Sequence, residues 1–177
     1  GVLVANASPF YAEAGGQVGD KGTMEFDGGT LRVLDTQKPV DGLIAHTVNV
    51  TNGTIAVGQT VSMTVDSGRR NEIRLNHTAT HLLHAALRDT LGDHVVQKGS
   101  LVAEDRLRFD FSHHKAVTRD ELRQIETRVC RDIMKNEGVQ TDVCTMDDAV
   151  ERGAMALFGE KYGDEVRVVD IPGLSVE

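Results

Sequence analysis

The chain has 177 residues and a formal net charge of −8, and 40% of its residues are hydrophobic. This length fits one domain or two small ones, and the hydrophobic fraction suits a folded core and is too high for a disordered chain. No apolar run is long enough to span a membrane. Only Cys130 and Cys144 are cysteines, which excludes a disulfide framework and a four-thiolate metal site and favours a reducing, cytoplasmic location.

The charge is unevenly distributed along the chain. Residues 1–66 carry a net charge of −4, residues 67–136 carry +3, and residues 137–177 carry −7. The middle segment is therefore the place where a polyanion such as a nucleic acid is expected to dock. Ordinary variation in surface charge explains the same imbalance, so this alternative stays open.

The first part of the chain is rich in β-branched residues separated by turn signals. It begins in the middle of a strand pattern and without Met, which suggests a piece of a longer protein. Four strands are expected, separated by Asp-Gly and Asn-Gly turns, at residues 2–5, 30–35, 44–50 and 60–66. Residues 1–66 are accordingly predicted to form a small barrel-like or folded β subdomain.

The second part, residues 67–177, is predicted to be α+β, with two long helices on a mainly antiparallel sheet. A helix over about residues 72–91 has an apolar stripe that comprises Ala79, Leu82, Leu83, Ala86 and Leu87. Thr118 and Glu121 form a capping box for a second helix, whose core face is expected to comprise Leu122, Ile125, Val129 and Ile133. Further strands are expected at residues 100–103, 107–111, 139–145 and 165–171, with a short helix at 147–153 that its own aspartates cap.

Two histidines form the first candidate site. His77 and His81 stand four residues apart, so a helix places both imidazoles on one face within reach of one metal ion. His84 continues this stripe, which is expected at the rim of a cleft. Thr78 replaces the glutamate that a zinc protease requires after its first histidine, which excludes that class. Two structural histidines explain the same spacing, and neither cysteine stands at metal spacing from another ligand.

Two loops are further candidates for ligand contact. The glycine-rich stretch Gly15-Gly16-Gln17-Val18-Gly19-Asp20 allows positive φ and close backbone approach, but it matches neither a phosphate loop nor a dinucleotide fingerprint. A simple hairpin turn is the alternative. Gln97 and Lys98 follow the first long helix and present an amide and a cation, unless they form an ordinary turn.

Several segments together resemble the editing region of alanyl-tRNA synthetases and their free-standing relatives that deacylate mischarged tRNA. The segments are Pro9–Asp20, Arg74–Leu83, Val96–Val102, Arg108–His113 and Gly153–Asp164. Each motif is weak by itself, whereas their order and spacing are specific. The resemblance implies a small β-barrel-like subdomain followed by an α+β editing core similar to that of threonyl-tRNA synthetase. It also implies hydrolysis of the ester in seryl- or glycyl-tRNA(Ala).

The resemblance also implies roles for individual residues. His77 and His81 match two zinc ligands of the family, and the other two would come from a Cys-Gly-Gly-Thr-His segment that follows the stretch equivalent to residues 174–177. This chain is therefore expected to bind zinc weakly or not at all. Thr80 and Gln97 are expected to contact the substrate, and the turn containing Gly15, Gly16, Gln17 and Asp20 is expected near the site. The tRNA phosphates are expected to contact Arg69, Arg70, Arg74, Lys98 and Arg106.

Three functional hypotheses remain at this point. The first is the editing hydrolase, which acts on mischarged tRNA(Ala) together with the rest of a synthetase chain. The second is a non-catalytic tRNA-binding fragment, because two implied ligands lie beyond Glu177. The third is a zinc hydrolase that acts on a small aminoacyl ester.

Overall fold

The computed structural model describes residues 1–154 and 165–176, so most of the Gly153–Asp164 stretch lies outside the described residues. The chain forms two compact units. Unit 1 comprises Gly1–Asn76 and Ser100–Arg108, and unit 2 comprises His77–Gly99 and Phe109–Glu177. The sequence predicts two domains that divide between residues 66 and 67. These compact units do not test that division, which stays a prediction.

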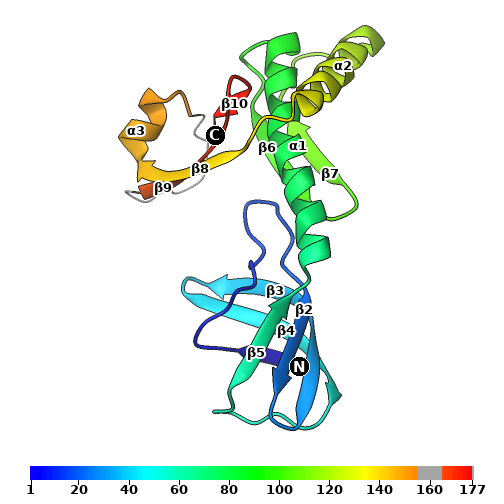
Figure 1. The fold of residues 1–177 in the computed structure, drawn as a ribbon. Helices are drawn as coiled ribbons and strands as arrows, with labels where there is room; N and C mark the ends of the chain where they lie inside the picture. The colour runs from blue at the N-terminus through cyan, green and yellow to red at the C-terminus, as the bar shows by residue number, and fades with distance from the viewer. Residues whose placement is uncertain (155–164, 177) are drawn as a thin grey trace. The chain divides into compact units, whose positions relative to one another are not determined.

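Unit 1 contains a five-stranded antiparallel sheet in the order β1-β4-β3-β2-β5 (Figure 1). Its strands are β1 (Val2–Val4), β2 (Gly22–Phe26), β3 (Gly29–Val40), β4 (Leu43–Asn52) and β5 (Val61–Val65). The four expected strands are present, and β3 is longer than predicted. In this sheet β1 and β5 are the two edges. The closure of a barrel therefore stays a prediction.

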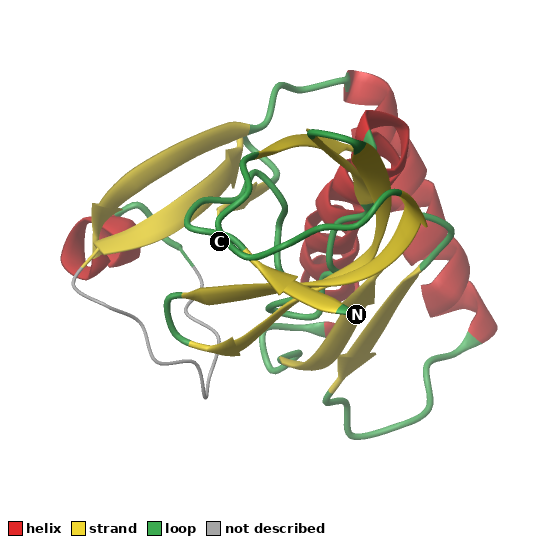
Figure 2. Cartoon of the chain, turned by 90° about the horizontal axis from the view of Figure 1, so that it is seen from below, coloured by secondary structure: helices red, strands yellow, loops and turns green. Residues whose placement is uncertain are grey.

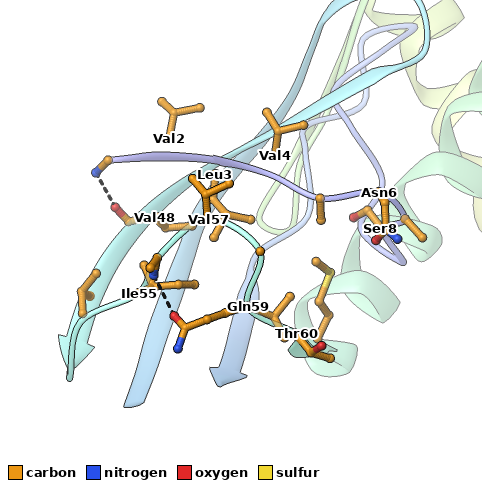
Figure 3. Close-up of a pocket in the computed structure, with 18 of the residues that line it drawn as sticks. Val2, Leu3, Val4, Asn6, Ser8, Val48, Ile55, Val57, Gln59 and Thr60 are labelled. Atoms are coloured by element: carbon orange, nitrogen blue, oxygen red, sulfur yellow. Dashed lines mark hydrogen bonds between the residues drawn. The ribbon is translucent and has the colours of Figure 1, made fainter. Parts of the chain in front are cut away.

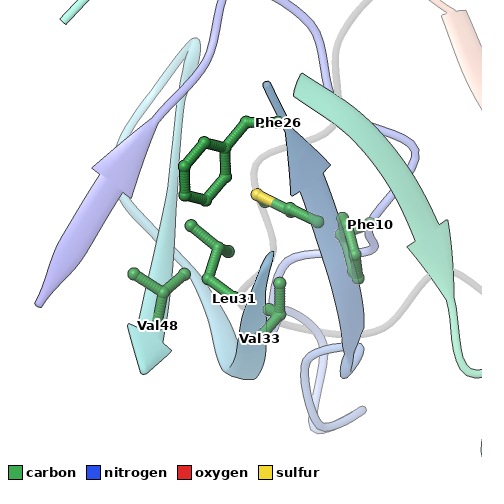
Figure 4. Close-up of a cluster of buried hydrophobic side chains, with 6 residues drawn as sticks. Phe10, Phe26, Leu31, Val33 and Val48 are labelled. Carbon is green, nitrogen blue, oxygen red and sulfur yellow. The ribbon is translucent and has the colours of Figure 1, made fainter. Parts of the chain in front are cut away.

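The core of unit 1 follows from strand alternation and from tight glycine turns. Gly28 and Gly42 have φ values of +84° and +77° and join β2 to β3 and β3 to β4. Successive strand side chains alternate between faces, so every second residue points inward. The buried cluster comprises Phe10, Met24, Phe26, Leu31, Val33 and Val48, whose side chains point toward one another (Figure 4).

Helix α1 (Ser67–Leu91) contributes residues to both units and begins five residues before its predicted start. The Asp66 carboxylate accepts a hydrogen bond from the Arg69 backbone N–H at 3.0 Å and so caps the first turn. In unit 2 the predicted apolar stripe is largely confirmed, because Leu82, Ala86 and Leu87 are buried. The helix ends before Gly92, as the sequence predicts, where φ is +116°.

Strand β6 (Gln97–Val102) pairs with β7 (Leu107–Phe111), and both lie beside α1 in Figure 1. In unit 2 the core cluster joins Ala86 and Leu87 of α1 to Val95 and to Ile125, with Phe109 and Phe111 packed against it. This cluster fixes the helix, the loop after it and the end of β7 as one packed layer.

Helix α2 (Arg119–Lys135) has the predicted capping box but a different core face. Leu122 and Ile133 are 50% and 54% exposed, so their predicted place in the core is wrong. Asp132 is buried instead, because Arg128 Nε and Lys135 Nζ hold its carboxylate at 2.6 and 2.7 Å. Because two cations pair with this carboxylate, the helix can bury a charged residue.

The last elements are β8 (Gln140–Thr145), α3 (Met146–Glu151), β9 (Glu165–Ile171) and β10 (Ser175–Val176). They form an antiparallel sheet in the order β10-β9-β8, and α3 directly follows β8 (Figure 2). The Thr145 hydroxyl accepts a hydrogen bond from the Asp148 N–H at 3.2 Å. The cap of α3 is thus a threonine, although the sequence predicts aspartate caps.

No helix among the described residues is long and apolar enough to cross a membrane. The expected cytoplasmic location stays a prediction.

Replacing a buried leucine on β3 tests the core of unit 1. Leu31 is 1% exposed, whereas Leu34 on the same strand is 43% exposed. Leu31→Ala should lower the free energy of unfolding by about 2–5 kcal/mol, because it removes buried apolar contacts and leaves a cavity. Leu34→Ala should change it by about 0.5 kcal/mol. Denaturant unfolding measures both, and equal losses would contradict the packing of this core.

The capping box of α2 should be visible in an acid titration. Hydrogen bonds from the Thr118 backbone and from Lys115 lower the pKa of Glu121 from 4.5 to about 2. The cap should therefore stabilise the folded chain above pH 4.5, and this stabilisation should disappear as the pH falls toward 2. A carbon-13 NMR titration of the Glu121 carboxyl measures the pKa. Lys115→Gln should raise it part of the way, and a wild-type value near 4.5 would show that the box does not form in solution.

Candidate functional site

The His77 and His81 rings lie one above the other on α1, within unit 2. Their ring centroids are 5.1 Å apart and their planes differ by 20°. The helical rise of one turn produces this arrangement, which directs both imidazoles to one side of the helix. Both residues are partly buried. Two adjacent imidazoles fit half of a zinc ligand set.

Among residues 1–154 and 165–176, no third histidine, cysteine or carboxylate completes a metal-binding group with this pair. Cys130 is exposed on α2 and Cys144 lies on β8, and both are free thiols. Zinc binding stays a prediction, and in the described part of the chain His77 and His81 are the residues that would hold the ion.

Thr80 and Gln97 occupy different positions in unit 2. Thr80 lies between the two histidines on α1 and is 7% exposed. Gln97 is partly buried and is the first residue of β6, which follows the loop after α1. Arg88 fixes that loop, because its guanidinium donates to the Asp93 carbonyl at 2.8 Å and to the Val95 carbonyl at 3.2 Å. These two hydrogen bonds fix the conformation of the loop that leads from the end of α1 to the first residue of β6.

His84 does not lie at the rim of a cleft, as the stripe had suggested. It is buried against the Phe109 ring, with the ring centroids 5.1 Å apart. One helical turn beyond His81, the face that carries the histidines therefore enters the core of unit 2.

The glycine-rich stretch in unit 1 is a tight turn that pairs with the end of β6. Gly15 and Gly16 have φ values of +56° and +83°, and the Gln17 N–H donates to the Ala14 carbonyl at 2.9 Å. The Val102 N–H donates to the Gly16 carbonyl at 2.8 Å, and the Val18 N–H donates to the Val102 carbonyl at 3.1 Å. These bonds describe the turn itself, and its expected place near the site stays a prediction.

Asp20 is a structural anchor within unit 1. It is 2% exposed, and its carboxylate accepts from the Tyr11 N–H at 2.6 Å and from the Arg70 Nε at 3.1 Å. Arg70 also donates to the Pro9 carbonyl at 2.8 Å. These hydrogen bonds satisfy the buried carboxylate and tie Asp20 and Arg70 to the turn.

Arg69 is engaged in the same way. Its guanidinium donates to the Gly19 carbonyl at 2.8 Å and forms an ion pair with Glu104, with Nε and Oε1 3.0 Å apart. The hydrogen bond from Arg69 is the main reason why the pKa of Glu104 lies below its ordinary value. The contact of Arg69 and Arg70 with tRNA phosphate stays a prediction, although both groups already have partners.

The other predicted phosphate ligands lie on the surface. Arg74 is exposed on α1 and Lys98 is exposed on β6. Arg106 is exposed and pairs with the neighbouring Asp105 at 2.9 Å. An exposed pair of this kind is weak. The phosphate contacts of Arg74, Lys98 and Arg106 stay a prediction.

The structure also brings together three histidines that are not among the predicted site residues. His94, His113 and His114 each offer a ring nitrogen, and these atoms all lie within 4.8 Å of one another. Only the adjacency of His113 and His114 was visible in the sequence, because His94 reaches them through the pairing of β6 with β7.

The cavity drawn in Figure 3 lies in unit 1 and has a volume of about 1120 Å³. It is lined by residues 1–9 and 55–61, together with Val48, Val50 and Met63. None of the predicted site residues lines it. It therefore carries no part of the candidate site.

The close approach at Gly16 yields a matched test. A Cβ atom on Gly16 would lie 2.5 Å from the Ser100 carbonyl oxygen, whereas one on Gly28, at nearly the same φ, would meet nothing within 4 Å. Both alanine substitutions impose the strain of positive φ, but only Gly16→Ala adds a backbone clash. Gly16→Ala should destabilise unit 1 by about 1–3 kcal/mol more than Gly28→Ala. Thermal or denaturant unfolding measures this difference, and equal effects would contradict the contact of the turn with β6.

Comparisons with known proteins agree with the resemblance in the sequence. The family model described as tRNA synthetases class II (A) matches residues 1–69. The chain is 57% identical to the alanine–tRNA ligase of Ruegeria sp. (strain TM1040) and 55% identical to that of Chelativorans sp. (strain BNC1), over 96% of its own length in both cases. It is 54% identical to the alanine–tRNA ligase of Rhodopseudomonas palustris over 97% of its length. The chain spans 19% of the length of each of these relatives. It thus belongs to the alanyl-tRNA synthetase family and corresponds to one segment of those longer proteins.

Proposed function

We propose that this segment edits mischarged tRNA by hydrolysing the ester that joins serine or glycine to tRNA(Ala). The stacked pair of His77 and His81 is the observation that carries this proposal. Its support is the match to alanine–tRNA ligases over 96% of the chain, together with the helical geometry that directs both imidazoles to one side of α1.

Physical chemistry explains why a synthetase for alanine needs a second site. Serine differs from alanine by one hydroxyl, and glycine differs from it by one methyl group. A pocket that selects alanine discriminates against such neighbours by only about 1–3 kcal/mol. A separate hydrolytic site removes the errors that remain after activation.

His77 and His81 would hold a zinc ion in this proposal, with the other ligands supplied by the Cys-Gly-Gly-Thr-His segment that the resemblance implies. When bound, zinc supplies a positive centre that orients the aminoacyl end or lowers the pKa of a water. The amide of Gln97 can both donate and accept, so it would bind the serine hydroxyl or the terminal ribose. Thr80 is buried beside the histidines and would fix the wall of the site next to them.

Release of serine from Ser-tRNA(Ala) tests the proposal. The assay compares this chain with a longer version that continues through the Cys-Gly-Gly-Thr-His segment. His81→Ala in the longer version should reduce both the zinc affinity and the deacylation rate by at least about 10–100-fold. Loss of a residue that only supports a metal ligand already has an effect of this size, and loss of the ligand itself should have a larger one. Glu72→Gln, an exposed change on the same helix, should leave both unchanged.

Three other results would lead elsewhere. A longer chain that binds zinc but leaves the ester intact would overturn the editing proposal. Salt-dependent binding of tRNA(Ala) without hydrolysis would support a non-catalytic tRNA-binding fragment. Equal hydrolysis of a small seryl ester would support a hydrolase that does not recognise the tRNA.

A further inference from the structure

Three histidines from two loops converge in unit 2. His94 lies in the loop between α1 and β6, and His113 and His114 follow β7. The centroid of the His94 ring lies 5.0 Å from that of the His113 ring and 4.9 Å from that of the His114 ring. The centroids of the His113 and His114 rings are 4.6 Å apart. These contacts put three imidazoles into one small group.

The backbone holds these loops firmly at both ends of the group. The Ser112 N–H donates to the Val96 carbonyl at 3.0 Å, so the residue before His113 is tied to a residue two positions beyond His94. Val95 is fully buried, and its carbonyl accepts from Arg88. The cluster is therefore a product of the fold, and its geometry does not depend on the side chains alone.

The atoms within the group have the spacing of a ligand set. His94 Nε2 and His113 Nδ1 lie 2.8 Å apart, and one ring nitrogen of each histidine lies within 4.8 Å of the other two. A metal with bonds of about 2.1 Å to nitrogen holds neighbouring tetrahedral ligands about 3.4 Å apart, so the observed separations are near those of a ligand set. The Nε2 atom of His113 is buried and has no hydrogen-bond partner among the described residues.

The neighbouring charges leave room for a cation. Lys115 lies next to His114, but its ammonium is held by the Glu121 carboxylate at 3.0 Å. Glu121 is also bound to the Thr118 hydroxyl and N–H. The ligand set is thus three imidazoles without a carboxylate, a composition that suits zinc and similar transition metals and does not suit magnesium or calcium.

We propose that His94, His113 and His114 form a metal site that binds one divalent transition-metal ion of the zinc type. The three protein ligands leave a fourth position for water or for a group from another molecule. The ion would join the loop after α1 to the loop before α2. This site shares no residue with the His77–His81 pair, so it stands independently of the proposed editing function.

Titration of the 177-residue chain with Zn²⁺ alone tests this site, followed by calorimetry and by NMR signals of the histidine rings. His94→Gln or His114→Gln should weaken the binding at least about tenfold. The double variant His77→Gln/His81→Gln should leave this binding unchanged. Zinc should shift the ring signals of His94, His113 and His114 together, and circular dichroism of the metal-free variants checks that they fold.

Two results would overturn the proposal. Binding that is lost in His77→Gln/His81→Gln and kept in both His94→Gln and His114→Gln would assign the ion to the other pair. Weak binding that every variant retains, with no shift of the three ring signals, would show that the cluster holds no ion. Neither result bears on the hydrolysis of Ser-tRNA(Ala), so the two proposals fail separately.

Discussion

The glycine-rich turn depends on the hydrogen bonds that the buried carboxylate of Asp20 accepts. This carboxylate accepts from the Tyr11 N–H on one side and from the Arg70 guanidinium of α1 on the other, while the Asp20 carbonyl accepts from the Thr36 hydroxyl on β3. A charge removed from water is stable only with such partners. One residue therefore ties the turn segment, the sheet and the first turns of α1 together within unit 1.

The same helix then carries the candidate site. Arg69 and Arg70 anchor the first turns of α1 in unit 1, and His77 and His81 follow on turns that belong to unit 2. An unbroken helix fixes the rotation between residues along its length, because each residue advances the turn by the same angle. The stacking of the His77 ring on the His81 ring therefore follows from the regular geometry of the helix.

Local signals predicted most of the elements. The capping box of Thr118 and Glu121, the stop at Gly92 and the turns at Gly28 and Gly42 are where the sequence indicates them, because each depends on the chemistry of neighbouring residues. Strand β2 was missed, although Met24 and Phe26 alternate with Thr23 and Glu25, because the run is short. Helix α1 begins five residues before its predicted start, directly after Asp66, whose carboxylate caps its first turn.

Features that depend on tertiary contacts could not be predicted from the sequence. Apolar periodicity put Leu122 and Ile133 inside, yet α2 buries Asp132 together with the cations that neutralise it. The resemblance places Asp20 near the site, and its hydrogen bonds with Arg70 and Tyr11 became visible only in the structure. The approach of His94 to His113 depends on how two strands pair, which no local pattern encodes.

A binding measurement with a stable substrate analogue tests the central claim most directly, which is that the face of α1 with His77 and His81 receives the aminoacyl end. The analogue is adenosine with serine joined to the 3′ position by an amide, compared with its alanine counterpart, on the longer chain with zinc. Seryl analogue binding should be tighter and should shift the NMR signals of His81 and Gln97. Equal binding of the two analogues, or binding that leaves the NMR signals of both residues unchanged, would contradict this claim.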